Sequence, residues 1–361
     1  MSGRLFVFAG GGTGGHLAPG LAVADELRRR ESDCRIHFVG SGRPVEEQML
    51  SESGYERSAH DVLPLSHLRR RPLSFIRSHW RAYRRQRASI RRDRPTAVIG
   101  LGGYVSVPVV LAAGRENVPV LLLEQNAVPG RANRLLARWF PICLTFEQSQ
   151  QGLPRGATFH LTGNPLRLAI AKLHQSVAGG SVDDQQNVAQ TRTLLVVGGS
   201  LGSQQINDSV VSAIQELGTT ALAGWRVVHQ TGPESAEATA TAYAQLHIEH
   251  IVQPFFSDLA EMYGQASLCV GRAGATTLTE LAASGVPAIL IPYPHAADDH
   301  QTANARVFEN ARAAVVEESP DRSSQPIDLS QSLRQLMTDD VRLEEMRSAM
   351  RSLARPDAAA A

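Results

Sequence analysis

The sequence has few cysteines and no long hydrophobic run, and both absences narrow what the protein can be. Only Cys34, Cys143 and Cys269 occur, they lie far apart, and no C-x-x-C pair is present. Neither a disulfide framework nor a zinc site is indicated, and a reducing cytosol fits this use of cysteine. No apolar stretch approaches the roughly 18–20 residues that span a bilayer. Because an apolar strand-like run begins at Leu5, we expect no signal peptide.

An excess of charge of either sign is also missing. The formal net charge of the 361 residues is +1, while 43% of them are hydrophobic and 20% are charged. The length predicts about two globular domains, and the balanced charge argues against a nucleic-acid partner. No Asp-x-Asp pair occurs, which many enzymes use to hold a nucleotide-sugar diphosphate through a metal. We therefore predict no metal site and no cofactor, with helix N-termini and glycine-loop amides neutralising the phosphates.

The positive charge is concentrated in one segment. Residues 69–94 contain 11 arginines and a single acid, Asp93. The apolar side chains among them are Leu73, Phe75, Ile76, Trp80 and Tyr83. A solvated helix face is one interpretation, but a basic segment with exposed apolar residues can instead lie on an anionic membrane surface. Nucleic-acid binding ranks last, because no recognition motif accompanies the segment.

The most informative stretch is GGGTGGHLAPG at residues 10–20. It follows the apolar run LFVFA and precedes apolar residues at helical spacing, with Pro19 suited to a first helical turn. Such a turn brings backbone N–H groups to a phosphate. The second predicted strand ends in GSG, without the carboxylate of a nicotinamide site, and His16 and Leu17 stand where a P-loop needs lysine and a hydroxyl residue. Another phosphorylated ligand is predicted, with a tight turn that binds nothing as the alternative.

Alternating strand-like and helix-like runs predict parallel α/β units in two halves. The first half offers LFVFA, RIHFVG, AVIGLGG, VPVLLLEQ and CLTF, and the second offers TRTLLVV, WRVVHQTG, HIVQPFF, ASLCVGRAG and PAILIPYP. Gly163 and Pro165 mark a hinge, so we place the domains at residues 1–163 and 164–340. The ligand is expected in a cleft at the carboxyl ends of the strands.

Three further glycine clusters end predicted strands, at residues 100–106, 198–202 and 271–287. In the last cluster a strand ends at Val270 and a helix is expected from about Thr277. Thr277 and Glu280 have the spacing of a capping box, so Glu280 is either a helix cap or a ligand for ribose hydroxyls.

Together these motifs resemble glycosyltransferase family 28, in particular its N-acetylglucosaminyltransferases that convert lipid I to lipid II in peptidoglycan synthesis. The matching segments are GGGTGGHLAPGLAVA, GLGGYVSVP, LLLEQNAVPGRANRLLA, TGNPLR, VVGGSLGSQQIN, GRAGATTLTELAASGVPAILIPYPHAADDHQTANA and RSLARPDAA. The resemblance implies the α/β GT-B fold, with two Rossmann-like doubly wound domains facing a central cleft and a C-terminal helix at 341–361 that returns to the first domain. It also implies inverting transfer of GlcNAc from UDP-GlcNAc to the C4 hydroxyl of the muramoyl sugar.

By motif position, the resemblance assigns residues to the donor site. It implies sugar contacts by Asn126 and Gln301, a nucleotide contact by Arg167, and recognition of uracil by the Phe256 backbone. The family often has an aliphatic residue at Phe256 and Asn at Asp299. The full UDP-GlcNAc set is Thr13, Gly14, Gly15, Asn126, Arg167, Ser200, Phe256, Ala275, Thr276, Thr277, Leu278, Thr279, Glu280 and Gln301.

For the acceptor, the resemblance points to Gly102, Gly103 and Tyr104. His16 is a candidate general base, since the ordinary histidine pKa of about 6.5 leaves much of it neutral at cytosolic pH. The alternatives are a histidine that only shapes the loop, and Glu124 as the base.

The implied partners are UDP-GlcNAc, lipid I, the anionic inner-membrane surface and other cell-wall or division proteins, with a peripheral location on the cytoplasmic face of the inner membrane. Two alternatives stay open. One is another GT-B enzyme of UDP-sugars, either a nonhydrolysing epimerase or a glycolipid glycosyltransferase. The other is a non-catalytic nucleotide-binding division protein, which would leave His16 and GLGGYVS unexplained.

Overall fold

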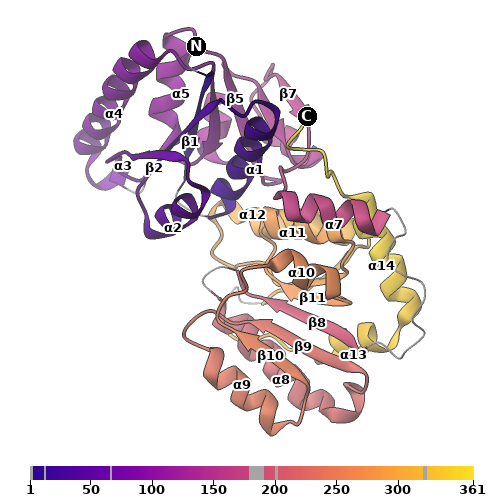
Figure 1. The fold of residues 1–361 in the computed structure, drawn as a ribbon. Coiled ribbons are helices and arrows are strands. Elements are labelled where there is room, and N and C mark those ends of the chain that lie inside the picture. Colours follow the sequence, from indigo (N-terminus) through magenta and orange to yellow (C-terminus); the bar gives the residue numbers. More distant parts are fainter. Residues whose placement is uncertain (1–2, 12–13, 66, 179–190, 200–201, 320–322) are drawn as a thin grey trace. The chain divides into compact units, whose positions relative to one another are not determined.

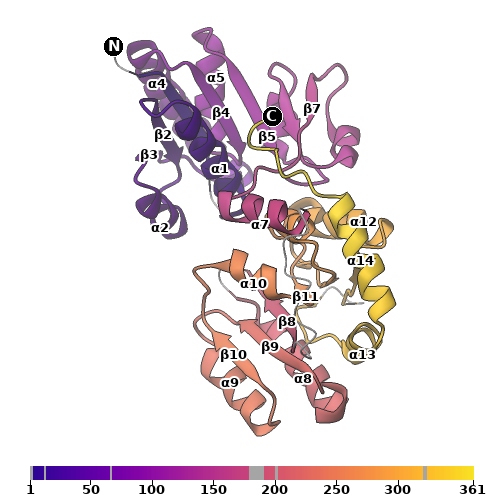
Figure 2. The ribbon, with the colours of Figure 1, turned by 45° about the vertical axis from the view of Figure 1, so that its right-hand side comes forward.

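A computed structural model describes residues 3–11, 14–65, 67–178, 191–199, 202–319 and 323–361. The chain divides into two compact units: unit 1 is Met1–Arg167 with Pro356–Ala361, and unit 2 is Leu168–Arg355. Each unit has a parallel sheet with helices packed beside it (Figures 1 and 2). The predicted architecture of two Rossmann-like doubly wound domains is therefore confirmed.

The described strands of unit 1 form a seven-stranded parallel sheet in the order β3-β2-β1-β4-β5-β6-β7. The strands are β1 (Leu5–Gly10), β2 (Arg35–Gly40), β3 (Glu56–Ala59), β4 (Ala97–Gly102), β5 (Val120–Glu124), β6 (Ile142–Leu144) and β7 (Phe159–Leu161). The strand order reverses between β1 and β4, and we refer to such a place as the switch point of its sheet.

Helices cover both faces of this sheet because β1 alternates its buried side chains. Leu5 and Val7 join the core beneath α4 and α5, whereas Phe6 and Phe8 join the core beneath α1. The helices of unit 1 are α1 (Gly14–Arg30), α2 (Pro44–Ser53), α3 (His67–Arg70), α4 (Pro72–Asp93), α5 (Ser106–Arg115), α6 (Arg131–Leu136) and the 3-10 helix η1 (Glu147–Gly152).

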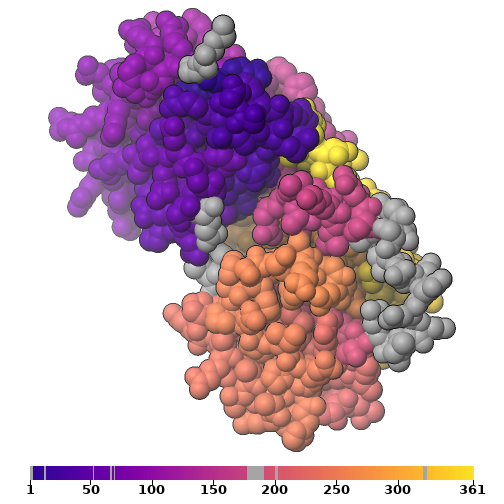
Figure 3. Space-filling view, in the orientation of Figure 1, coloured from indigo at the N-terminus to yellow at the C-terminus, as the bar shows by residue number. Residues whose placement is uncertain are grey.

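The described strands of unit 2 form a six-stranded parallel sheet in the order β10-β9-β8-β11-β12-β13, with its switch point between β8 and β11. The strands are β8 (Arg192–Val197), β9 (Trp225–Gln230), β10 (His250–Gln253), β11 (Leu268–Gly271), β12 (Ala288–Leu290) and β13 (Ala314–Val316). The helices are α7 (Leu168–Ala178), α8 (Gln204–Ala221), α9 (Ala236–Gln245), α10 (Leu259–Gln265), α11 (Ala275–Ser284), η2 (Ala297–Asp299), α12 (His300–Asn310), α13 (Ser330–Thr338) and α14 (Asp340–Ser352). Helices α7 and α10 lie side by side at the surface of this unit (Figure 3).

The C-terminal segment differs from the expectation in one respect. We expected residues 341–361 to return to the first domain as a helix, but α14 belongs to unit 2, where it packs against α11 and α13. Its apolar residues Leu343 and Met346 lie in the core of unit 2, which explains this placement. Only Pro356–Ala361 groups with unit 1, where the Ala360 carbonyl accepts a hydrogen bond from Arg30 at 2.9 Å.

Candidate functional site

The switch point of unit 1 is built from two glycine turns in contact. A Cβ atom on Gly10 would lie 2.7 Å from the carbonyl oxygen of Gly102, and one on Gly103 would lie 3.1 Å from that of Gly11. Gly102 and Gly103 have φ angles of 93° and 74°, which side chains disfavour. Glycine is therefore required at this contact, at the carboxyl ends of β1 and β4, where open α/β sheets usually bind their ligands.

His16 lies directly against this pair of turns. Helix α1 begins at Gly14, earlier than the sequence predicted, so Gly14, Gly15 and His16 form its first turn and Pro19 lies deeper inside the helix. A Cβ atom on Gly102 would lie 3.2 Å from Cδ2 and 3.6 Å from Nε2 of His16. The half-buried imidazole thus packs on bare backbone, and a side chain at residue 102 would displace it.

Glu124, the alternative base, is held by four hydrogen bonds. Its Oε1 accepts from the backbone N–H and the Nδ2 of Asn126, at 3.0 and 3.4 Å. Its Oε2 accepts from the N–H of Gly130 and from Nδ2 of Asn133, at 2.8 and 3.0 Å. The residue is only 3% exposed. This carboxylate therefore holds the loop after β5 in place.

In unit 2, the predicted capping box does not form. Helix α11 begins at Ala275 with Gly274 as its N-cap, two residues before Thr277, so Thr277 and Glu280 lie inside the helix. The hydroxyl of Thr279 donates to the carbonyl of Ala275 at 2.9 Å. Glu280 is buried, with 4% exposed. The helix-cap interpretation of Glu280 is therefore wrong, because the glycine turn ends earlier than the sequence pattern suggested.

Leu278 is a buried residue of the same helix. Its side chain is 0% exposed within the core, and its backbone N–H donates to the carbonyl of Gly274 at 3.0 Å. The predicted donor contact of Leu278 stays a prediction. Ala275 is also buried, whereas Thr276 and Thr277 are half-buried on the first turn of α11.

Two other predicted donor residues are held by side-chain to backbone hydrogen bonds. The N–H of Phe256, a residue 7% exposed, donates to Oε1 of Gln230 at 3.0 Å. Oε1 of Gln301, in the first turn of α12, accepts from the N–H of Tyr293 at 2.9 Å. Asp299 precedes that helix in a left-handed conformation and accepts from the hydroxyl of Thr302.

Sequence reasoning missed two side chains at the carboxyl edge of the unit 2 sheet. Gln230 ends β9, and its amide joins the carbonyl of Gly199 to the N–H of Phe256. Arg272 follows β11 and is held by neighbouring carbonyl, amide and hydroxyl oxygens. The only signal for Arg272 was its place inside the motif GRAG, which we read for its glycines.

For three of the predicted donor residues, the structure gives little or no contact geometry. Thr13 and Ser200 lie outside the described residues. Arg167 is half-buried and is the last residue of unit 1 before the chain enters unit 2. The acceptor candidate Tyr104 is half-buried next to Gly103.

The basic segment forms the long helix α4, with an apolar stripe exposed on one side. Leu73, Ile76 and Trp80 are 82%, 59% and 59% exposed, and their spacing places them on one face. Phe75 instead lies half-buried, with its ring centroid 4.0 Å from that of His79. The arginines Arg77, Arg81, Arg84 and Arg85 are exposed, and none forms an ion pair among the described residues.

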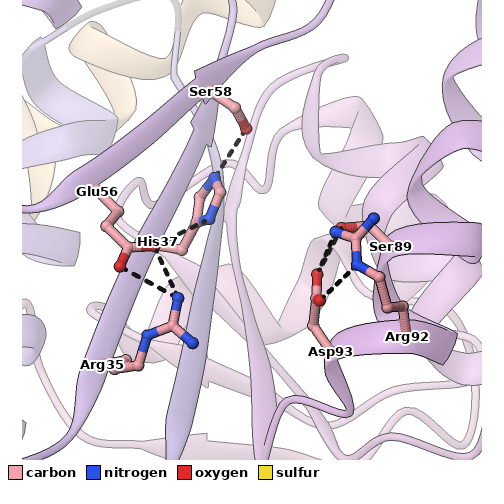
Figure 4. A network of polar contacts seen from close by, with 7 residues as sticks. All are labelled: Arg35, His37, Glu56, Ser58, Ser89, Arg92 and Asp93. Carbon is pink, nitrogen blue, oxygen red and sulfur yellow. Dashed lines mark hydrogen bonds and ion pairs between the residues drawn. The ribbon is translucent and has the colours of Figure 1, made fainter.

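A small cavity lies in unit 1, lined by residues of β1, β2 and α4, among them His37 and Asp93. Figure 4 shows the polar network there: His37 bonds Ser58 at 2.8 Å, and Arg35 pairs with Glu56 at 3.1 Å. The cavity volume is about 40 Å³, room for a few water molecules. It is too small for a sugar nucleotide.

Two features are absent from the described residues. No group of three or more His, Cys, Asp or Glu side chains is arranged to hold a metal ion. Among the described helices, none is both long and apolar enough to cross a bilayer.

Comparison with known proteins gives matches across both units. Residues 6–141 match the glycosyltransferase family 28 N-terminal domain, and residues 193–361 match the glycosyltransferase family 28 C-terminal domain. The chain is 38% identical to the UDP-N-acetylglucosamine–N-acetylmuramyl-(pentapeptide) pyrophosphoryl-undecaprenol N-acetylglucosamine transferase of Syntrophotalea carbinolica, covering 96% of this chain and 94% of the relative. The crystal structure of Acinetobacter baumannii MurG is 30% identical, with a TM-score of 0.75 over 99% of this chain and 97% of that one. A UDP-N-acetylglucosamine 2-epimerase structure has a TM-score of 0.65 over 100% of this chain and 94% of its own, but at 13% identity it shares only the fold.

Proposed function

Given that this chain belongs to glycosyltransferase family 28, we propose that it transfers GlcNAc from UDP-GlcNAc to the C4 hydroxyl of the muramoyl sugar of lipid I, with inversion, giving lipid II. It is a glycosyltransferase with the GT-B fold. The observation that carries the proposal is the match, over nearly the whole of both chains, to a transferase whose name gives this donor and this acceptor.

The two switch points support different roles for the two units. The first turn of α11 presents backbone N–H groups at the positive end of a helix, which suits a phosphorylated donor. We assign Glu280, Gln301 and the Phe256 backbone to that donor. In unit 1, the half-buried turn of Gly103 and Tyr104, with His16 packed beside it on Gly102, suits the acceptor sugar. The other donor residues named from the sequence remain part of this proposal.

We assign the general base to His16. In the proposed step, the acceptor oxygen bonds to C1 of GlcNAc as the bond from C1 to the diphosphate breaks. UDP leaves with the electron pair, and the imidazole of His16 takes the proton of the hydroxyl. Glu124 is the weaker candidate, because its carboxylate oxygens already accept four hydrogen bonds.

The test of the reaction is turnover of UDP-GlcNAc with a short-chain lipid I analogue. The expected result is release of UDP and a disaccharide product, neither of which forms without the acceptor. An epimerase would instead convert the UDP-sugar in the absence of any acceptor. A non-catalytic nucleotide-binding protein would bind UDP and give no product, and either outcome would overturn the proposal.

For the membrane, we propose that α4 docks unit 1 on anionic lipid at the cytoplasmic face of the inner membrane. The exposed stripe of Leu73, Ile76 and Trp80 supports shallow insertion, and the unpaired arginines beside it support attraction to the headgroups. Each arginine near the surface contributes on the order of 1 kcal/mol. A lipid-linked acceptor stays in the bilayer, so the enzyme has to reach it there.

The docking test uses vesicles that contain phosphatidylglycerol. Replacing Arg77, Arg81 and Arg84 by Glu is expected to release the protein and to lower activity on membrane-embedded acceptor, while activity on a soluble analogue is largely kept. The matched control replaces Arg28, Arg29 and Arg30, at the end of α1, by Glu. It changes the net charge equally, and it should leave vesicle binding much less affected. An equal loss of vesicle binding in both triple variants would mean that only the net charge of the protein matters, and it would contradict docking through α4.

A further inference from the structure

Arg272 is a cation surrounded by neutral groups. Its Nη1 donates to Oε1 of Gln205 at 2.9 Å and to the carbonyls of Ile291 and Pro292 at 3.1 and 3.3 Å. Its Nη2 donates to the hydroxyl of Ser203 at 2.8 Å. None of the described carboxylates forms an ion pair with this guanidinium, so its charge is balanced by dipoles alone.

Part of the Arg272 guanidinium is open to a ligand. Arginine has five N–H donors. The two on Nη1 face the amide and carbonyl oxygens, and one on Nη2 faces Ser203. The Nε–H and the remaining N–H of Nη2 have no partner among the described residues.

The side chain is held in place from several directions. Gln205, 4% exposed, also donates to the carbonyls of Ser323 and Gln325 at 3.3 and 2.7 Å, which fixes the amide that receives Arg272. The guanidinium carbon lies 5.5 Å from the ring centroid of Tyr293. Burial lowers the pKa of Arg272 to about 10, so the group stays charged at neutral pH while partly removed from water.

Its position in the fold is the switch point of unit 2. Arg272 follows β11 directly, and Ser203 is the N-cap of α8, which starts after the neighbouring strand β8. Helix α11 starts three residues after Arg272, at Ala275. The positive ends of two helices and a guanidinium are thus assembled by the loops of two adjacent strands.

We propose that Arg272 binds the diphosphate of the donor through its open N–H groups and stabilises the charge of the departing UDP. This rests on the proposed function, which makes the ligand a nucleoside diphosphate sugar. Arginine binds phosphate oxygens with two parallel hydrogen bonds. Negative charge grows on the diphosphate as the bond to C1 breaks, so a fixed cation there favours the transition state. Arg272 would supply the positive charge that other transferases obtain from a metal ion.

The test compares ligands that differ only in their phosphates. Calorimetric titration of Arg272→Met with UDP should show affinity lowered roughly 10- to 100-fold, the loss of a charged hydrogen bond. Affinity for uridine, which lacks phosphate, should stay within about twofold of the unmodified enzyme. The UDP affinity of Arg272→Lys should lie between that of the unmodified enzyme and that of Arg272→Met, because lysine keeps the charge but cannot form two parallel hydrogen bonds.

The matched control is Arg226→Met. Arg226 is also in unit 2 and also bonds only neutral oxygens, on Thr193 and Gln265, both at 2.9 Å, but it lies near the start of β9. It should leave affinity for both ligands unchanged. Equal losses of UDP and uridine affinity in Arg272→Met would overturn the proposal, since they would mean that the loop has collapsed. Unchanged UDP affinity would overturn it as well.

The outcome separates this proposal from the proposed function. If the unmodified enzyme binds UDP and transfers GlcNAc while Arg272→Met does so equally well, only the role of Arg272 fails. A second outcome is that the unmodified enzyme binds inorganic diphosphate but not UDP, and that Arg272→Met no longer binds diphosphate. In that case the assignment of the donor is wrong, and Arg272 still forms an anion site.

Discussion

The two sheets share the order of their first six strands, and they differ in the chemistry at their switch points. In both, the third strand lies at an edge and the fourth returns to the far side of the first. Unit 1 places glycine turns in contact there, with His16 packed on Gly102. Unit 2 places Arg272 there, held by Gln205 and Ser203. The shared topology predicts where a ligand binds in each unit. Under our proposals, the loop residues then decide whether that place takes the proton of a hydroxyl or binds a diphosphate.

The largest expected effect concerns the proposed base at the switch point of unit 1. His16→Ala should lower kcat by roughly 10²- to 10⁴-fold, the range for loss of a general base, while UDP affinity stays unchanged. Steady-state kinetics with a soluble acceptor and UDP titration measure the two effects. The matched control is His37→Gln, a histidine of β2 that bonds Ser58 and faces the small cavity. A kcat within tenfold of the unmodified enzyme would reduce His16 to a residue that shapes the loop.

We expect the stability of unit 2 at acid pH to depend on a buried histidine. His229 is 0% exposed, with Nδ1 2.9 Å from the Tyr243 hydroxyl and Nε2 3.0 Å from Oδ1 of Asn207. Burial lowers its pKa to about 3, so the unfolded chain binds the proton more readily below pH 6.5. Stability should fall as the pH drops from 6.5 toward 3, by roughly 2–3 kcal/mol at pH 4.5.

Denaturant unfolding at several pH values tests this. His229→Gln should weaken the dependence of the free energy of unfolding on pH for unit 2. His60→Gln should do the same for unit 1, where burial lowers the pKa of His60 to about 4. An unchanged slope in His229→Gln would mean that other groups control the acid sensitivity.

Donor affinity should depend on Glu280 more modestly. Glu280→Gln is expected to weaken UDP binding roughly 10-fold, through loss of a charged hydrogen bond to ribose. The matched control is Ser284→Ala, a buried polar residue at the other end of α11 that the proposal does not place at the donor. If the melting temperature of Glu280→Gln falls while UDP affinity holds, the carboxylate has a purely structural role in α11.

Much of this arrangement could be read from the sequence, and the exceptions have physical causes. Strands such as β1 and β8 are apolar runs that end in glycine, so both their type and their ends were predictable. Strands β3 and β7 were missed because their residues are largely exposed and they are recognised only through pairing with β2 and β6. Arg272 was missed because its partners Gln205 and Ile291 are 67 and 19 residues away.

Glu124 offers a way to sharpen the assignment of the base. Glu124→Gln keeps the shape but replaces one carboxylate oxygen, which accepts two of the four hydrogen bonds, by an amide NH₂ that cannot accept them. We expect a loss of stability of roughly 1–2 kcal/mol and a smaller effect on kcat than in His16→Ala. Thermal unfolding and kinetics on the same sample decide between the roles. Unchanged stability with kcat as low as in the His16 variant would transfer the role of base to Glu124.

The smallest expected effect is that of metal removal. Turnover should persist in excess EDTA, since we assign neutralisation of the diphosphate to Arg272 and to helix N-termini. The check is a progress curve with and without chelator. Complete loss of activity, restored by magnesium or manganese, would show that the cation at this switch point is a metal.

The return of the last six residues to unit 1 has a consequence for anyone who divides the protein. The polypeptide leaves unit 1 after Arg167 and re-enters it at Pro356, so no single cut yields two whole halves. A fragment that stops at Arg167 lacks Ala358, which is 7% exposed, and the carbonyl that receives Arg30. Unit 1 in isolation is therefore best made by a short fusion that restores residues 356–361, and unit 2 by excising 168–355 as an insert.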